Sequence, residues 1–203
     1  MQSQITTLQD YLPKESYPII SEYLSRWKVN VIVSRKRISK HGDYRILPNE
    51  AHQITINKTI NVFRFLITLV HEISHLVAFK TYGNMIKPHG KHWKLCYREM
   101  MMPFLNDSIF PSPLLERLAF HFKNPRASTD SDFKLVVELN KFDPETEFTY
   151  IFELNEGSVF KIHNNRKFVL GSKRVKRYEC KEISTGRLYL FSPHAKVMLL
   201  VNF

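Results

Sequence analysis

Three residues in the middle of the chain have the types and the spacing of a metal-dependent hydrolytic site. They are His71, Glu72 and His75, in the stretch His71-Glu72-Ile73-Ser74-His75. On a helix, residues four apart lie on one face, so the two imidazoles can bind one tetrahedral zinc ion. Zinc lowers the pKa of a bound water, and the neighbouring Glu72 can then act as general base. The pattern predicts a zinc-dependent peptidase site.

A catalytic zinc site needs a third protein ligand and an open fourth position. Metzincin spacing would require glycine and histidine where the sequence has Ala78 and Thr81, which excludes that arrangement. His89 is the favoured third ligand, because it lies at the junction between a loop and a predicted helix, where a side chain can fold back to the metal. His92 and Glu99 stay open as alternatives, since a helix-borne glutamate is the third ligand of gluzincin-type sites.

The first part of the chain contains the elements that must position this site. Apolar residues on most faces predict a buried helix that starts near 59–61 and runs to about Thr81, with Asn61 as N-cap and Gly83 near the C-cap. By the same reasoning from periodicity and turn residues, the other expected elements are helices over about 6–27, 91–101 and 111–122 and strands over 29–34, 44–47 and 52–56.

The pattern changes after a polar stretch at 124–132, which we predict to be a linker. Short strand-like segments follow at 133–139, 148–154, 160–163, 167–170, 177–180 and 188–191. We therefore expect an α+β chain of two domains, residues 1–125 and residues 126–203, of which the second is small and β-rich.

The composition indicates a basic protein, with a formal net charge of +11 over 203 residues. No signal peptide and no apolar run long enough to span a bilayer are expected, and Cys96 and Cys180 are predicted to be free thiols, so we predict a cytoplasmic protein. Positive charge is clustered at 26–45, 80–98 and 161–181, with net charges of +6, +5 and +7. Such clusters favour nucleic acid as a partner.

The third basic cluster contains aromatic residues as well, an arrangement suited to single-stranded nucleic acid, whose bases stack while its phosphates pair. The equally weighted alternative is that the aromatics are core residues and the charges are simply solvated. The candidate nucleic-acid contacts are Lys167, Lys173, Arg174, Lys176 and Arg177.

The active-site stretch, followed by His89-Gly90-Lys91-His92-Trp93-Lys94, resembles the SprT (Spartan-type) family of zinc metallopeptidases, which includes a protease of DNA–protein crosslinks. The resemblance covers about residues 5–105. It implies a minimal zincin fold, zinc on His71, His75 and His89, and Glu72 as the catalytic base. It also implies that substrate lies along an edge strand, for which residues 52–57, including Thr55 and Asn57, are the candidate; the alternative for that segment is a plain core strand.

The sequence departs from the family at its C-terminal end, where bacterial members have a zinc ribbon with two Cys-x-x-Cys pairs. Around Cys180 one knuckle is recognisable, but Ile183 stands where its second cysteine would be, and the partner pair is absent. We therefore expect a degenerate ribbon with an apolar core, one catalytic zinc and no second structural zinc.

The function that these observations favour is a zinc-dependent metalloendopeptidase that acts on DNA-associated or DNA-crosslinked proteins, with single-stranded DNA preferred and a location at the nucleoid or chromatin. Two alternatives stay open: a zinc peptidase unrelated to DNA, and a nucleic-acid-binding adaptor with a zincin fold and little protease activity. The group that stabilises the oxyanion is not fixed by the sequence; Tyr82, His92 and Tyr97 are candidates.

Overall fold

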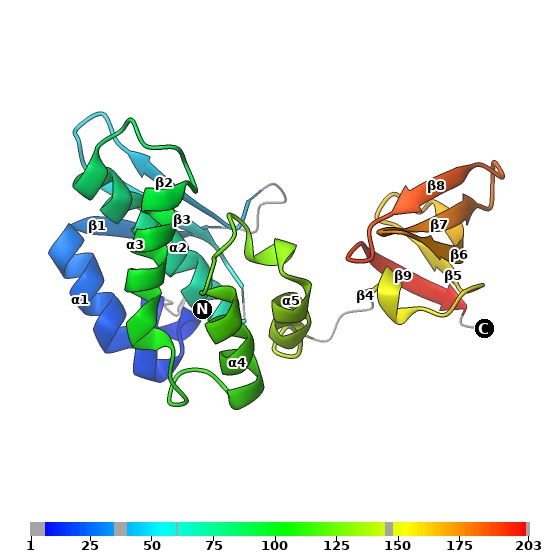
Figure 1. Ribbon diagram of the computed structural model, residues 1–203, viewed down its shortest axis with the longest axis horizontal. Helices are drawn as coiled ribbons and strands as arrows, with labels where there is room; N and C mark the ends of the chain where they lie inside the picture. Colours follow the sequence, from blue (N-terminus) through cyan, green and yellow to red (C-terminus); the bar gives the residue numbers. More distant parts are fainter. Residues whose placement is uncertain (1–6, 35–39, 60, 145–147, 202–203) are drawn as a thin grey trace, which may run out of the picture. The chain divides into compact units, whose positions relative to one another are not determined.

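The computed structural model describes residues 7–34, 40–59, 61–144 and 148–201. It divides the chain into two compact units, Met1–Pro144 and Glu145–Phe203 (Figure 1). The first is a mixed unit of helices and a small sheet, and the second is an antiparallel β unit, which confirms the predicted α+β class.

Unit 1 contains the predicted helices and strands, several of them with the predicted bounds. The long helix predicted over 6–27 is shorter, because Pro13 interrupts it: two 3₁₀ turns come first, and the α-helix begins only at Tyr17, with Pro18 in its first turn. In chain order the elements are η1 (Leu8–Tyr11), η2 (Lys14–Ser16), α1 (Tyr17–Trp27), β1 (Val29–Ser34), β2 (Gly42–Ile46), β3 (His52–Asn57), α2 (Val62–Tyr82), α3 (Lys91–Met101), η3 (Met102–Phe104), α4 (Ser112–His121), η4 (Thr129–Ser131) and α5 (Phe133–Asn140).

The described strands of unit 1 form one sheet in the order β1-β3-β2. β3 pairs in parallel with β1, from Val29 opposite His52 onward, and antiparallel with β2, with Asp43 opposite Thr55. The prediction that residues 52–57 form an edge strand is therefore wrong: Thr55 and Asn57 lie on the central strand, whose two sides are both used in pairing. β2 is the edge strand that packs against α2.

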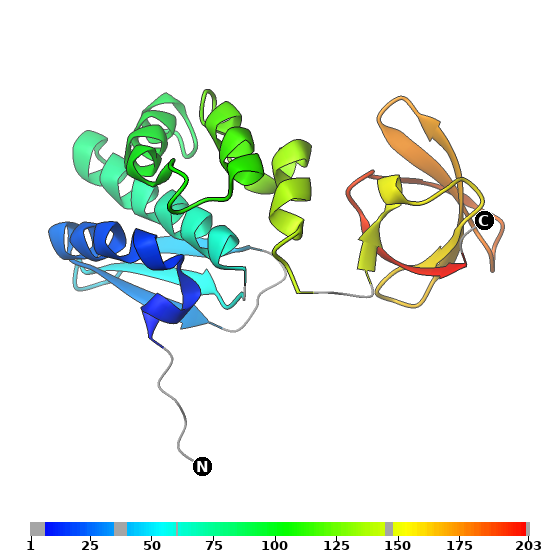
Figure 2. The same ribbon diagram turned by 90° about the horizontal axis from the view of Figure 1, so that it is seen from below.

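Helix α2 is the core of unit 1 and lies between the sheet on one side and α3 on the other (Figure 2). By length and composition alone it could cross a membrane, but 61% of its most apolar window is buried inside the unit, as in the core helix of a folded domain. The predicted caps are confirmed: the Asn61 side chain accepts a hydrogen bond from the Arg64 N–H, and Gly83, with φ 79°, ends the helix.

Residues 133–140 form helix α5, so the strand predicted over 133–139 is wrong. The β-branched pair Val136-Val137 favours a strand. However, Asp132 caps a helix by accepting a hydrogen bond from the Leu135 N–H, and Leu135, Val136 and Leu139 form one buried face. Tertiary burial of that face outweighs the weak local preference for a strand.

Two polar residues at the start of α2, the N-cap Asn61 and Arg64, bind the end of α5. Asn61 donates to the Leu139 carbonyl at 2.8 Å and to Asp143 at 2.6 Å, and Arg64 Nε lies 3.1 Å from the same Asp143 carboxylate. Because of these contacts unit 1 extends to Pro144, rather than to the boundary predicted after residue 125, and the predicted linker at 124–132 is part of unit 1.

The described residues of unit 2 form a six-stranded antiparallel sheet in the order β4-β9-β5-β6-β7-β8. Its core is apolar and includes Phe160, Phe168 and Cys180, and burial raises the pKa of the Cys180 thiol to about 11. The expected small β-rich unit with an apolar core is thus present, whereas its descent from a zinc ribbon stays a prediction. Its elements are β4 (Phe148–Tyr150), η5 (Ile151–Glu153), β5 (Val159–Lys161), β6 (Lys167–Arg174), β7 (Arg177–Glu182), β8 (Leu188–Phe191) and β9 (Lys196–Val201), of which β9 was not predicted.

A buried carboxylate, that of Glu182, connects the residues at one end of this sheet through hydrogen bonds. Glu182 is only 4% exposed, accepts a hydrogen bond from Arg166 at 2.6 Å and another from the Thr185 hydroxyl at 2.5 Å. The Arg166 guanidinium lies over the rings of Phe168 and Tyr189. The hydrogen bonds from Arg166 and Thr185 lower the pKa of Glu182 to about 2.

We predict that Glu182→Gln destabilises unit 2 at pH 7 and that this difference shrinks in acid. The folded-state pKa lies below the ordinary value of 4.5, so the stabilisation is fully present above pH 4.5 and is lost as pH falls toward 2. The difference in stability is measured as the shift in the urea midpoint of unit 2 at several pH values. Unfolding of unit 2 in the full chain is monitored through the NMR signals of residues 148–201. Glu156→Gln, at an exposed glutamate of the same unit, is the control; an equal effect of both variants, or a gap that does not narrow in acid, would contradict the prediction.

Candidate metal centre and active site

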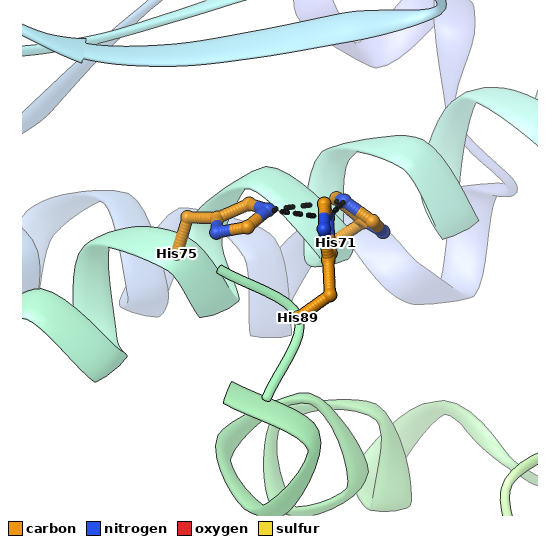
Figure 3. A group of neighbouring side chains, drawn as sticks. All are labelled: His71, His75 and His89. Atoms are coloured by element: carbon orange, nitrogen blue, oxygen red, sulfur yellow. Dashed lines mark hydrogen bonds between the residues drawn. The ribbon is translucent and has the colours of Figure 1, made fainter. Parts of the chain in front are cut away.

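The Nε2 atoms of His71, His75 and His89 converge on one point (Figure 3). They lie 3.2 Å (71 to 75), 3.0 Å (75 to 89) and 3.2 Å (89 to 71) apart. Zinc–nitrogen bonds of about 2.0–2.1 Å in a tetrahedral site place ligand nitrogens about 3.3 Å apart. A neutral imidazole has one N–H, so three Nε2 atoms facing each other cannot all be satisfied by mutual hydrogen bonds. The group therefore fits a zinc ion.

The third imidazole belongs to His89, whose backbone is in a strained conformation. His71 and His75 come from successive turns of α2, whereas His89 lies just before α3 with φ 56°, in the left-handed region that non-glycine residues rarely adopt. Of the three candidates for the third ligand, the structure places His89 with the pair. His92 is exposed with its ring 4.4 Å from that of Tyr82, and Glu99 is exposed on α3.

Trp93 forms the floor against which all three imidazoles pack. Its ring centroid lies 4.7 Å from His71, 5.2 Å from His75 and 4.7 Å from His89, and the side chain is fully buried. Its indole N–H has no hydrogen-bond partner in the described part of the chain, so the indole acts by shape and packing. In the sequence, Trp93 is only one member of the motif that follows the active-site helix. Its spacing of four residues from His89 is the signal that could have identified it.

The environment keeps the imidazoles neutral, which is the form that binds metal. Burial, together with the neighbouring histidines, lowers the pKa of His71 to about 3 and that of His75 to about 4. Burial also lowers the pKa of His89. Protons therefore compete less with a metal ion at these ligands than at an ordinary histidine.

Glu72 is 7% exposed and lies where the edge strand comes closest to α2. A Cβ atom on Gly42 would lie 2.6 Å from Glu72 Oε1, 2.8 Å from Glu72 Cγ and 2.9 Å from Thr68 Cγ2. Only glycine leaves room for the Glu72 carboxylate at this point. No local sequence pattern reveals this close approach between Gly42 and Glu72.

A cavity of about 520 Å³ opens onto the three histidines and Glu72. One wall is formed by residues 40–44, another by α2, and a third by residues 127–130, the stretch predicted to be a linker. Asp130 connects the walls: its carboxylate lies 2.7 Å from His41 Nε2 and 3.7 Å from Arg64 Nη1. The three candidates for oxyanion stabilisation, Tyr82, His92 and Tyr97, are not among the residues that line the cavity.

Comparison with known proteins agrees with this geometry. Residues 17–111 match the SprT-like family, which is in general a family of zincin-type metallopeptidases. Protein SprT from Pseudomonas fluorescens strains Pf0-1 and SBW25 is 45% identical over 31 residues, which are 15% of this chain. The matched stretch spans only 19% of the length of each of these relatives. No solved structure matches significantly.

We predict that His89→Ala loses zinc whereas His92→Ala keeps it. The two histidines are three residues apart, but only His89 reaches the other imidazoles. Loss of a ligand should cost at least the roughly 10–100-fold in affinity that loss of a ligand's supporting partner costs. Zinc content after dialysis and a chelator competition assay measure it. If both variants retain zinc equally, His89 is not a zinc ligand.

Proposed function

We propose that the chain is a zinc-dependent endopeptidase of SprT type. The observation that carries the proposal is the meeting of three imidazoles and one buried carboxylate at one cavity. His71, His75 and His89 would hold a zinc ion, which would supply Lewis-acid polarisation of a carbonyl and lower the pKa of a water molecule. The match of residues 17–111 to the SprT-like family supports the same chemistry.

Glu72 is the proton carrier in this proposal. It follows His71 directly on α2 and lines the cavity, so its carboxylate can accept a proton from the attacking water and deliver it to the leaving amine. Gly42 of β2 lies directly against the Glu72 side chain and so confines the carboxylate on the side of β2. A general base held in this way needs little reorganisation when the reaction begins.

Strand β2 replaces β3 as the proposed substrate strand. It is an edge of the sheet, and residues 42–44 line the cavity beside Glu72. The free side of an edge strand offers backbone N–H and C=O groups to an extended peptide, which would then lie across the catalytic residues. Since such binding uses backbone groups, it suits an endopeptidase of broad sequence preference.

We further propose that the substrates are proteins held on or crosslinked to nucleic acid, in the cytoplasm at the nucleoid or chromatin. The support is the net charge of +11 and its clustering in both units. In the first basic cluster, Arg35, Lys36 and Arg37 lie outside the described residues; in the second, Lys80 and Lys91 are exposed near the ends of α2 and α3. Phosphate contacts of this kind raise the local concentration of DNA-bound protein at the active site.

We expect Glu72→Gln to abolish cleavage while zinc stays bound, because the amide cannot take the proton. The assay is cleavage of a DNA-binding protein by the zinc-loaded chain, with and without single-stranded DNA, together with zinc content. Cleavage that requires DNA supports the whole proposal, and cleavage independent of DNA restricts it to a zinc peptidase. Undiminished cleavage by the variant would overturn the assigned mechanism.

Gly42→Ala tests the confinement of Glu72. The added methyl group would overlap the carboxylate, so we expect zinc content to be unchanged and kcat to fall by about 100-fold, the cost of a displacement near 1 Å. Pro48→Ala, at an exposed residue of the turn that follows β2 and outside the cavity, is the control. A normal kcat in Gly42→Ala, or loss of its zinc, would contradict this role of Gly42.

A further inference from the structure

The β6–β7 hairpin of unit 2 ends in a concentrated positive charge. Lys173 pairs with Tyr178 and Arg174 with Arg177, which leaves Val175 and Lys176 as the connecting residues. We call residues 173–177 the basic tip; its four cationic side chains are all exposed. Lys167, the fifth residue predicted to contact nucleic acid, lies at the other end of β6 opposite Lys161 and is not part of the tip.

Val175 is an unfavourable residue for the turn in which it lies. Its φ of 41° is left-handed, where a β-branched side chain is crowded against the backbone, and two-residue hairpin turns prefer glycine, asparagine or aspartate at such positions. Its side chain is 94% exposed, so packing within the chain does not offset the strain. Folding gains nothing from valine here, which points to a contact outside the chain.

The charges around Val175 indicate an anionic partner. Arg174 pairs with Glu179 at 3.1 Å, whereas Lys176 and Arg177 have no ion pair in the described part of the chain. The Lys173 ammonium lies 5.8 Å from the Tyr178 ring centre, which gives the root of the tip an aromatic residue beside a cation. Cations that can pair with phosphates, next to an exposed apolar residue, match proteins that wedge side chains against unstacked bases.

We infer that the basic tip binds single-stranded nucleic acid, with its cations on phosphates and Val175 against the face of an unstacked base. The inferred binding extends the nucleic-acid part of the proposed function and rests on that part. It does not depend on the proposed peptidase chemistry. An anionic membrane surface would also attract the cations. It is less well matched, because stable lipid anchoring needs a far larger apolar surface than one valine.

The decisive variant is Val175→Asn, which relieves the strain and removes the apolar contact together. It is made in the full-length, zinc-loaded Glu72→Gln protein, so that failure of binding and failure of cleavage are separated. Binding to a fluorescent oligo-dT is measured by anisotropy across a salt series, and stability by thermal unfolding. We expect higher thermal stability, about 10-fold weaker binding and an unchanged salt dependence, because no phosphate contact is lost. Arg177→Gln should instead reduce the salt slope by about 0.7.

Val201→Asn, at a half-exposed valine of β9, is the matched control and should leave affinity unchanged. If the Val175→Asn variant is more stable but binds oligo-dT with wild-type affinity, Val175 is only a strained turn residue and the inference is overturned. Equal affinity for a blunt duplex of the same length would overturn the preference for unstacked bases. Binding to phosphatidylglycerol vesicles that falls in Val175→Asn, with oligo-dT binding unaffected, would reassign the tip to a lipid surface.

Discussion

The burial of helix α2 is the constraint on which the rest of the site depends. Because the sheet and α3 enclose the helix, its two imidazoles are exposed only toward the cavity, and Trp93 packs against both rings. The same burial lowers the pKa of His71 and His75. Packing and ligand protonation state therefore have one cause: a helix apolar enough to form the core presents neutral imidazoles in fixed orientations.

The remaining parts of the site are arranged around that helix by polar contacts. Arg64 reaches both Asp130 and Asp143, and thereby connects the cavity wall at 127–130 with the end of α5. Asn61 caps α2 and also binds the carbonyl of Leu139. The first turn of α2 thus organises the third wall of the cavity, about two turns before the residues that would perform the chemistry. A stretch that looks like a linker in sequence becomes part of the site through the contacts of Asp130 with Arg64 and His41.

Local sequence rules predicted what local physics determines. Helical spacing placed His71 and His75 on one face, Asn61 and Gly83 marked the ends of α2, and β1 and α3 have their predicted bounds. His89 could be favoured but not chosen over His92 from spacing alone, since its reach depends on a left-handed backbone before α3.

Features that depend on pairing across the chain could not be predicted in this way. Strand order is one of them: periodicity shows that residues 52–57 form a strand, but β1 and β2 decide that this strand is central. The helical state of α5 is another, because its buried face is fixed by contacts to α2 more than 70 residues earlier. The closeness of Gly42 to Glu72 is a third, since it joins a hairpin to a helix.

Backbone strain distinguishes the residues that local structure explains from those that it does not. The described residues include five non-glycine positions with positive φ. Lys28 ends α1, Glu50 lies in the turn between β2 and β3, and Asn165 is a residue type that tolerates this region. His89 and Val175 remain. His89 is held by the imidazoles and Trp93 around it, so its strain is balanced inside the fold. Val175 is 94% exposed and has no such surroundings, which is the observation behind the inferred contact with a partner outside the chain.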